Sequence, residues 1–368
     1  MSVGGKQMSY PTIAIVGAQG SIGQALAAAL HHHGMCVLRL GSRHSQNELS
    51  FSEPPFLWRL VDGSNIESIN AFIHGCDLVV NCSGPFHNVG LNVVKAAIEQ
   101  RIDVIDVNAG YPELIKLRQQ FSEVIERHHR HVVVGCGLMP GLTEALPLWA
   151  STQVQGMQHL RFVLVGHDKF THAAASDVIV AAKQRLRSQF SLNMTHHALP
   201  TNFASILPEV TEFIAYQDDE LDFIKKVTGV RTIEAWIGYL GKRTQSALKR
   251  ALAMNEVAQA ATVVVNASIV DLAERPPFQH FLCELLGEHK QTLASLQMRG
   301  QSASELCAAA IATVIEGMLT QKITPGVYLG SQVLSESWAI QSLHSHQSVS
   351  FLHLVKGALY TAPEEGVI

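Results

Sequence analysis

Short apolar runs alternate with amphipathic, helix-forming stretches over the first 150 residues of the chain. Apolar runs rich in β-branched residues are typical of strands buried on both faces of a parallel sheet, with helices in the connections. The pattern therefore predicts an α/β domain over residues 10–150, a doubly wound Rossmann sheet. Its expected strands are 13–16, 37–40, 57–61, 78–81, 104–107 and 132–134, and its expected helices are 21–33, 66–74, 89–99 and 112–129.

The pattern changes after residue 150. Strand-like segments become fewer and too widely spaced for tight hairpins alone, which indicates a second, α+β domain over residues 151–323 that we assign to substrate binding and dimerisation. Residues 324–368, which open with Pro325-Gly326, are expected to return to the first domain. The expected strands of the second domain are 160–165, 232–239 and 292–298, its expected helices are 177–189, 242–274 and 304–320, and 193–208 is an expected loop.

The first apolar run meets a three-glycine turn that opens directly into an Ala- and Leu-rich helical segment. A strand, a tight glycine turn and a helix N-terminus together hold a pyrophosphate, because the backbone can approach the ligand and the helix offers free N–H groups. The spacing is G-x-x-G-x-x-G, and an ordinary strand-turn-helix connection is the alternative. The candidate cofactor-binding residues of this loop are Gly17, Ala18, Gln19, Gly20, Ser21, Ile22 and Gly23.

The second predicted strand runs into Ser42-Arg43-His44 rather than an acidic residue. An Asp or Glu at this position holds the ribose 2′-hydroxyl of NAD, whereas a guanidinium can clamp the 2′-phosphate of NADP with two hydrogen bonds. We therefore expect NADP(H), with Arg43 on the phosphate, Ser42 as a donor to it and His44 as a further donor. The alternative is that these residues form an ordinary solvated loop with no phosphate bound.

Two more strand ends carry candidate cofactor-binding residues, since ligands bind at the carboxyl ends of the strands in a doubly wound sheet. Asp62 can accept a hydrogen bond from the adenine amino group, although Asp62 or Ser64 can instead cap the helix that follows. The fourth strand ends in a turn of small residues against which the nicotinamide ribose can lie, with an aromatic ring to cover it. These residues are Cys82, Ser83, Gly84, Pro85 and Phe86.

The net charge of −4 argues against a nucleic-acid-binding surface, and no apolar run is long enough to span a bilayer. The N-terminus lacks the apolar core of a signal peptide, and the six cysteines form no C-x-x-C pair, which indicates reduced thiols in the cytoplasm. Histidine occurs 19 times, but its consecutive runs cannot converge on one ion, so no metal site is expected.

A series of motifs resembles the saccharopine dehydrogenase-like oxidoreductases across residues 12–145. They are G-A-Q-G-S-I-G, D-L-V-V-N-C-S-G-P-F, V-G-L-N-V-V-K-A-A-I, D-V-I-D-V-N and G-C-G-L-M-P-G-L. The resemblance implies an NADP-binding Rossmann domain, an α/β substrate domain whose sheet supports dimerisation, and a C-terminus that folds back onto the first domain. It matches residues 17–23 to the phosphate loop, Ser42 and Arg43 to the 2′-phosphate pair, and residues 83–86 to the turn beside the nicotinamide.

Asn108 stands where the family usually has an acidic or hydroxyl residue, and it is a further candidate of the cofactor site. The change removes a charge, which disfavours an amino-acid substrate held through its ammonium group. For the proton donor we consider Tyr111 after the fifth strand, and Lys169 and His172 after the first strand of the second domain. Tyr239 is a weaker candidate, and each of these residues could instead be structural.

The expected activity is an NADPH-dependent reduction of a C=N (imine) bond in a small or carrier-bound intermediate, because the family resemblance points to C–N chemistry. Two alternatives remain open at this point. One is an enoyl (C=C) reductase of lipid or polyketide intermediates, as some relatives are. The other is a non-catalytic module that senses NADP. The expected partners are a small-molecule substrate and a second copy of the chain, and neither nucleic acid nor a membrane.

Overall fold

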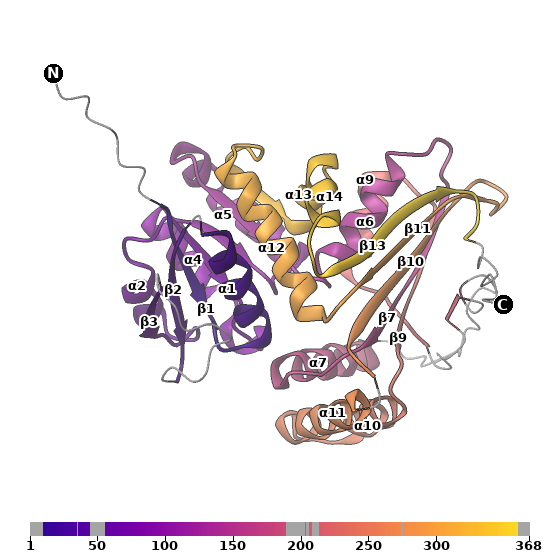
Figure 1. The fold of residues 1–368 in the computed structure, drawn as a ribbon, viewed down its shortest axis with the longest axis horizontal. Helices are drawn as coiled ribbons and strands as arrows, with labels where there is room; N and C mark the ends of the chain where they lie inside the picture. The colour runs from indigo at the N-terminus through magenta and orange to yellow at the C-terminus, as the bar shows by residue number, and fades with distance from the viewer. Residues whose placement is uncertain are drawn as a thin grey trace, which may run out of the picture.

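The computed structural model describes residues 10–34, 36–44, 56–188, 203, 206–207, 213–273 and 275–359. Two sheets, one near each end of the molecule, organise these residues (Figure 1). The predicted loop at 193–208 lies almost wholly outside the described residues. No helix of the described ranges is long and apolar enough to cross a membrane.

The first sheet has seven parallel strands in the order β12-β6-β5-β4-β1-β2-β3. The order reverses between β1 and β4, which is the switch point at which doubly wound folds bind dinucleotides. The predicted Rossmann fold is therefore confirmed. Its strands are β1 (Thr12–Val16), β2 (Val37–Ser42), β3 (Phe56–Leu60), β4 (Leu78–Asn81), β5 (Asp103–Asp106), β6 (His131–Val134) and β12 (Gly326–Leu329).

The helices of this domain follow the predicted segments with two differences, one of which is the unpredicted helix α6. The expected helix at 89–99 is two helices, because Gly90 adopts a φ of +54° between them. Gly34 ends the first helix in the left-handed conformation. The helices are α1 (Ser21–His33), α2 (Ile66–Ile73), α3 (Phe86–Val89), α4 (Asn92–Gln100), α5 (Tyr111–Arg127) and α6 (Leu142–Ser151).

The second sheet is mixed, with the strand order β13-β11-β10-β7-β9-β8. Strands β10 and β11 form an antiparallel hairpin closed around residues 287–291, and β10 was not among the expected strands. One sheet face packs into the main core through Phe162 and Phe281, whose ring centroids are 5.4 Å apart. The strands are β7 (His159–His167), β8 (Phe213–Ala215), β9 (Thr232–Tyr239), β10 (Phe278–Leu286), β11 (Thr292–Gly300) and β13 (Val349–Lys356).

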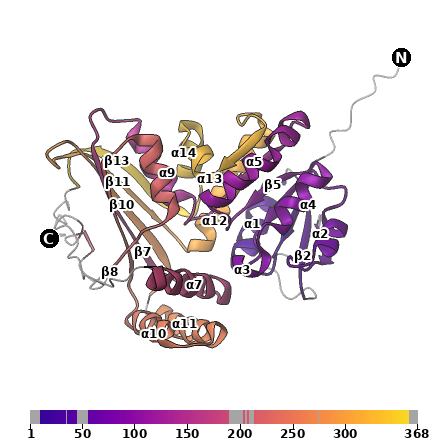
Figure 2. The same ribbon diagram turned by 180° about the vertical axis from the view of Figure 1, so that it is seen from behind.

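Three helices, α7 (His172–Ser188), α10 (Lys242–Ala253) and α11 (Val257–Leu272), form a layer at one end of the second sheet (Figure 1 and Figure 2). The segment 242–274 was expected to be mostly one helix, but the chain turns at residues 254–256. Residue 274 lies outside the described residues. The turn folds α11 back against α10, so that their alanines pack together with Ile179 of α7.

The C-terminal part of the chain contributes to both sheets. Strand β12 pairs with β6 at the edge of the Rossmann sheet, whereas β13 pairs with β11 in the second sheet. Helix α12 (Ala303–Leu319) packs against α1, and α13 (Gly330–Leu334) packs against α6. The remaining helix of this part is α14 (Ser337–His344). Because the chain crosses between the sheets repeatedly, the two domains are tied together at several points.

Three acidic side chains meet where α9 (Asp219–Thr228) packs against α5 and α6. Glu144 is fully buried at the third position of α6, and Glu220 is 5% exposed. Burial raises the pKa of Glu144 to about 7, and burial beside Asp218 and Glu144 raises the pKa of Glu220 to about 9. Glu220 is therefore protonated near pH 7, whereas Glu144 changes from its protonated to its ionised form around that pH.

The hydrogen bonds of Glu144 fit a protonated side chain. The Thr143 hydroxyl lies 2.6 Å from Oε1 of Glu144 and 3.1 Å from the carbonyl oxygen of Leu138. The hydroxyl has one hydrogen, which can go to Leu138 if Glu144 donates to Thr143. Oε2 accepts from the amide of Gly141, so both carboxyl oxygens are paired.

We predict that Glu144→Gln stabilises the protein at alkaline pH and leaves it unchanged near pH 4. A raised folded-state pKa means that the stability is complete below the unfolded pKa and is lost as pH rises towards 7. The cost at pH 8 is about 3 kcal/mol, from about 1.4 kcal/mol per pKa unit. Denaturant unfolding of both proteins from pH 4 to pH 9 measures the difference.

Glu113→Gln is the matched control, because Glu113 occupies the same capping-box position in α5 but is only partly buried. A gain in stability for Glu144→Gln that is the same at every pH would contradict the raised pKa of Glu144.

Candidate active site

Two glycines have no room for a side chain, one in the loop between β1 and α1 and one in the first turn of α1. Gly17 has a φ of +83°, and a Cβ there would lie 2.8 Å from the amide nitrogen of Ser83. A Cβ on Gly23 would lie 2.3 Å from the carbonyl oxygen of Gly17. The loop is thus packed against the turn that follows β4 and against its own helix, which allows the backbone to approach a ligand.

Gly20 differs from its neighbours, because a Cβ there would meet only the carbonyl oxygen of Gly17, at 3.2 Å. Its φ is −69°, so the backbone conformation at this position does not require glycine. Gly20 precedes the first residue of α1, Ser21, and no side chain caps this helix. The start of the helix, which no side chain caps, fits a bound pyrophosphate.

The end of β2 is braced against the glycine loop. The Ser42 hydroxyl lies 2.9 Å from Oε1 of Gln19, and the amide nitrogens of Gly17 and Ala18 donate to the carbonyl of Gly41. Ser42 is 8% exposed and also bonds the backbone of His44. The structure therefore uses Ser42 to hold the loop, while its role as a phosphate donor stays a prediction.

Arg43 is exposed beside a cavity, which fits a guanidinium that binds a 2′-phosphate. Asp62 lies close enough to attract it, and hydrogen bonds from the amide and hydroxyl of Ser64 lower the pKa of Asp62. The alternative that Asp62 or Ser64 caps the next helix is wrong, because Asn65 caps α2 and accepts from the Ser68 amide. The adenine role of Asp62 stays a prediction.

The turn after β4 is held by a buried polar network. The amide of Asn81 donates to Asp106 at 2.6 Å, and Oδ1 of Asn81 accepts from the amide and hydroxyl of Ser83. Asp106 also accepts from the amides of Asn108 and Ala109. Burial raises the pKa of Asp106, and its three N–H donors oppose this shift. The network fixes the carboxyl ends of β4 and β5 relative to each other.

Asn108 joins the network from the other side, since its side-chain amide donates to the carbonyl oxygen of Ser83 at 2.9 Å. A carboxylate here could not make this bond, because it has no hydrogen to donate. The departure from the family pattern therefore has a structural consequence in this chain. Asn81 and Asp106 were not among the predicted site residues, and their signal was a polar residue at the end of each buried apolar strand.

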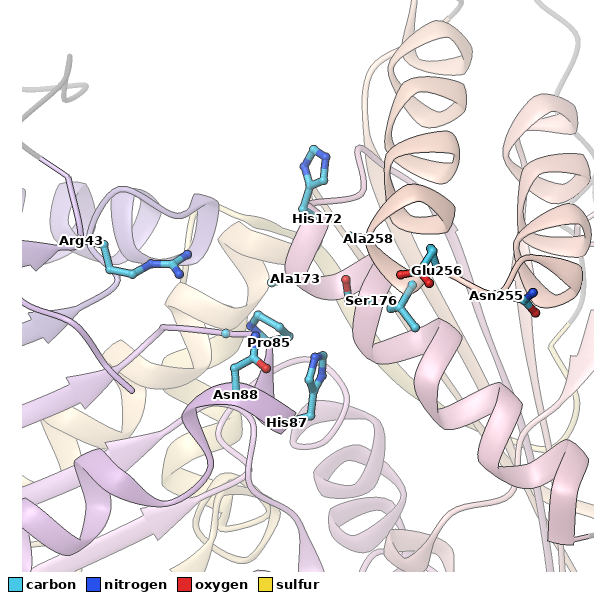
Figure 3. A pocket seen from close by; sticks show the side chains of 12 residues that line it. Arg43, Pro85, His87, Asn88, His172, Ala173, Ser176, Asn255, Glu256 and Ala258 are labelled. Atoms are coloured by element: carbon cyan, nitrogen blue, oxygen red, sulfur yellow. The ribbon is translucent and has the colours of Figure 1, made fainter. Parts of the chain in front are cut away.

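A cavity of about 540 Å³ lies between the Rossmann domain and the helix layer of the second domain (Figure 3). Arg43 lies on one side of it, the turn after β4 on another, and the start of α7 and of α11 on the third. Its lining therefore brings together predicted cofactor-binding residues with residues of the second domain. The residues are Arg43, Gly84, Pro85, His87, Asn88, His172, Ala173, Ser176, Asn255, Glu256, Val257 and Ala258.

The three predicted proton donors lie in different parts of the structure, and only one of them lines the cavity. His172 lines the cavity as the first residue of α7, and its side chain is exposed. Tyr111 instead packs its ring on Phe223 of α9, with centroids 5.3 Å apart, and its amide donates to Glu220. Lys169 is exposed in the turn after β7 and does not line the cavity.

Tyr239, the weaker candidate, lies 5.4 Å from the ring of Phe170. Burial raises the pKa of Tyr239 to about 12, which makes it a poor proton donor near neutral pH.

Three thiols lie close together at the turn after β4, where Cys136 and Cys307 are buried and Cys82 is partly buried. Cys82, Cys136 and Cys307 are close enough to influence one another, and Cys307 accepts a hydrogen bond from the Leu138 amide at 3.1 Å. Burial raises the pKa of all three thiols, that of Cys307 to about 12. They are therefore protonated near neutral pH and are poor nucleophiles.

We predict that Arg43→Ala weakens NADPH binding by about 2 kcal/mol, the order of one charge-assisted pair. NADH binding is expected to change little, because NADH has no 2′-phosphate. Titration of the nicotinamide fluorescence gives both affinities. Equal losses for the two cofactors would show that Arg43 does not read the 2′-phosphate.

Comparison with known proteins agrees with this geometry. Residues 13–126 match the family model of the saccharopine dehydrogenase NADP binding domain. A lipid droplet localized protein of Caenorhabditis elegans is 28% identical over 78 residues, which are 21% of this chain and 18% of that protein's length. The matched segment is thus a small part of that relative.

Similarity of the fold to a solved structure covers nearly the whole chain. Apo saccharopine dehydrogenase (L-Glu forming) from Saccharomyces cerevisiae superimposes with a TM-score of 0.65 at 11% identity, over 95% of this chain and all of that one. At this identity the likeness concerns the fold, while the family match concerns the cofactor domain and assigns NADP(H) to it. Residues 13–126 are therefore similar to saccharopine dehydrogenase NADP binding domains, which supports NADP(H) as the cofactor of this Rossmann domain, and the chain as a whole shares the fold of saccharopine dehydrogenase.

Proposed function

We propose that the chain is an NADPH-dependent reductase of C=N (imine) bonds in small or carrier-bound intermediates. The observation that carries this proposal is the cavity between the turn after β4 and the start of α7, because it joins the cofactor domain to the second domain. The boundaries 10–150, 151–323 and 324–368 are part of the proposal, with the substrate held mainly by the middle segment.

The cavity offers hydrogen-bonding groups next to the turn assigned to the nicotinamide. Asn88, His172 and Ser176 line it, together with the small side chain of Ala173. Such a lining supports a polar acceptor such as an imine, whose nitrogen must gain a proton as its carbon gains a hydride. Bound NADPH supplies the hydride, and the chain supplies orientation and the proton.

His172 is the best placed of the candidate proton donors. It is the first residue of α7, its side chain lines the cavity, and its Nε2 lies 3.4 Å from the hydroxyl of Thr262. This contact orients the imidazole, which is a frequent general acid in enzymes. Tyr111 and Lys169 lack such a position in the cavity.

The six cysteines are all free. Unpaired thiols are typical of proteins kept in a reducing compartment, which supports a cytoplasmic location for this activity.

We expect the purified protein to consume NADPH with a panel of cyclic imines and not with enoyl thioesters. His172→Ala is expected to lower the rate by roughly 10²- to 10⁴-fold, the usual contribution of a general acid. His344→Ala, an exposed histidine on α14 outside the cavity, is the control. Absorbance at the NADPH band follows the reaction. Turnover of enoyl thioesters alone would favour the C=C alternative, and no turnover with either panel would favour an NADP sensor.

The second sheet supports the further proposal that the protein is a homodimer. Helices α10 and α11, which could have capped this sheet in a monomer, pack mainly against α7 instead. The sheet face away from the main core carries Phe278, Arg299 and Phe351, all only partly buried among the described residues. Its guanidinium and aromatic groups are typical of interface residues, and a symmetric partner would cover them.

Light scattering at micromolar concentration is expected to give twice the 40.1 kDa chain mass. Phe351→Glu is expected to shift the mass towards the monomer, because it places a charge on the proposed interface. A wild-type mass near that of one chain would exclude the dimer.

A further inference from the structure

The turn beside the proposed nicotinamide position contacts the second domain directly. A Cβ built on Gly84 would lie 3.3 Å from the Cβ of Ala173, so α7 approaches the turn closely. One helical turn further along α7, Oδ2 of Asp177 accepts a hydrogen bond from the amide of Phe86 at 3.3 Å. The other carboxylate oxygen lies 3.4 Å from Nδ1 of His87.

These contacts give helix α3 a side-chain acceptor at its N-terminus. Phe86 is the first residue of α3, and the residue before it, Pro85, provides no side-chain cap. The first amides of a helix need an acceptor from outside, and a carboxylate is the most favourable one. Asp177 thus caps a helix of the Rossmann domain from a helix of the other domain.

The turn is consequently held from two sides. Within its own domain, Asn81 binds the amide and hydroxyl of Ser83, and Asn108 binds its carbonyl. From the second domain, Asp177 binds the amide of Phe86. Only the second of these attachments depends on how the two domains are placed relative to each other.

We propose that Asp177 is a positioning residue that sets the turn at residues 83–86 for the nicotinamide and couples that position to the packing of the second domain. This inference rests on the proposed function, because that proposal places the nicotinamide at this turn. Asp177 does not line the cavity, so it acts through the two groups that it contacts, the amide of Phe86 and the imidazole of His87.

The test compares two ligands that share one end. NADPH reaches from the Arg43 end to the turn, whereas 2′,5′-adenosine diphosphate carries the 2′-phosphate but no nicotinamide. Asp177→Ala is expected to weaken NADPH by roughly tenfold, the order of a hydrogen bond to a charged group, and to shift the emission of its nicotinamide. Binding of 2′,5′-adenosine diphosphate is expected to stay within twofold of wild type.

Two variants control for other effects. Asp177→Asn keeps an oxygen that can accept from the Phe86 amide, and it is expected to recover most of the NADPH affinity. Asp222→Ala removes an exposed carboxylate from α9, away from the turn, and is expected to change neither ligand. Calorimetry gives both dissociation constants, and thermal unfolding checks that each variant folds.

The outcomes separate this inference from the proposed function. If wild type binds NADPH and Asp177→Ala binds it equally well with the same emission, the positioning role is overturned. Equal weakening of both ligands also overturns it, since it would indicate a general loss of structure. If wild type does not bind NADPH, the proposed function fails and this inference fails with it.

Discussion

The side-chain amide of Asn81 donates a hydrogen bond of 2.6 Å to the carboxylate of Asp106, and both side chains are almost fully buried. This bond joins the carboxyl ends of β4 and β5. The other side-chain oxygen of each residue accepts hydrogen bonds from the turn that follows its own strand. Gly17 packs against the amide of Ser83, so the glycine loop is placed by the same network. A buried donor or acceptor left without its partner costs about 1–3 kcal/mol, so the pair is maintained as a unit.

The two domains meet at the carboxyl ends of the Rossmann strands, where the cofactor site also lies. The C-terminal part of the chain contributes β12 to the Rossmann sheet and β13 to the second sheet. Acidic residues of α9 and α6 share a buried junction on one side, and α7 approaches the turn after β4 on the other. In the proposed reduction, this arrangement would keep water away from the reacting bond.

Elements that depend on local pattern were well predicted, and those that depend on distant partners were not. Strand β10 escaped prediction because its apolar run contains the buried polar residues His280 and Glu284. Nε2 of His280 lies 2.7 Å from Nε2 of Gln297 on the neighbouring strand, and Oε2 of Glu284 lies 3.5 Å from Nε of Arg161. A single strand cannot show that its polar residues have partners across the sheet. The break between α10 and α11 was missed for a similar reason, since no Gly or Pro marks it.

By itself, the sequence determined the Rossmann alternation, the glycine loop and the absence of an acid at the end of β2, because each depends on neighbouring residues and on backbone sterics. It also contained the motifs that the family match covers. Tertiary structure alone decided that His172 reaches the cavity while Tyr111 packs on α9. It alone decided that Asp177 reaches Phe86 across 91 positions of sequence. Contacts between distant segments depend on how helices and sheets pack, and packing is set by the whole core and not by any local pattern.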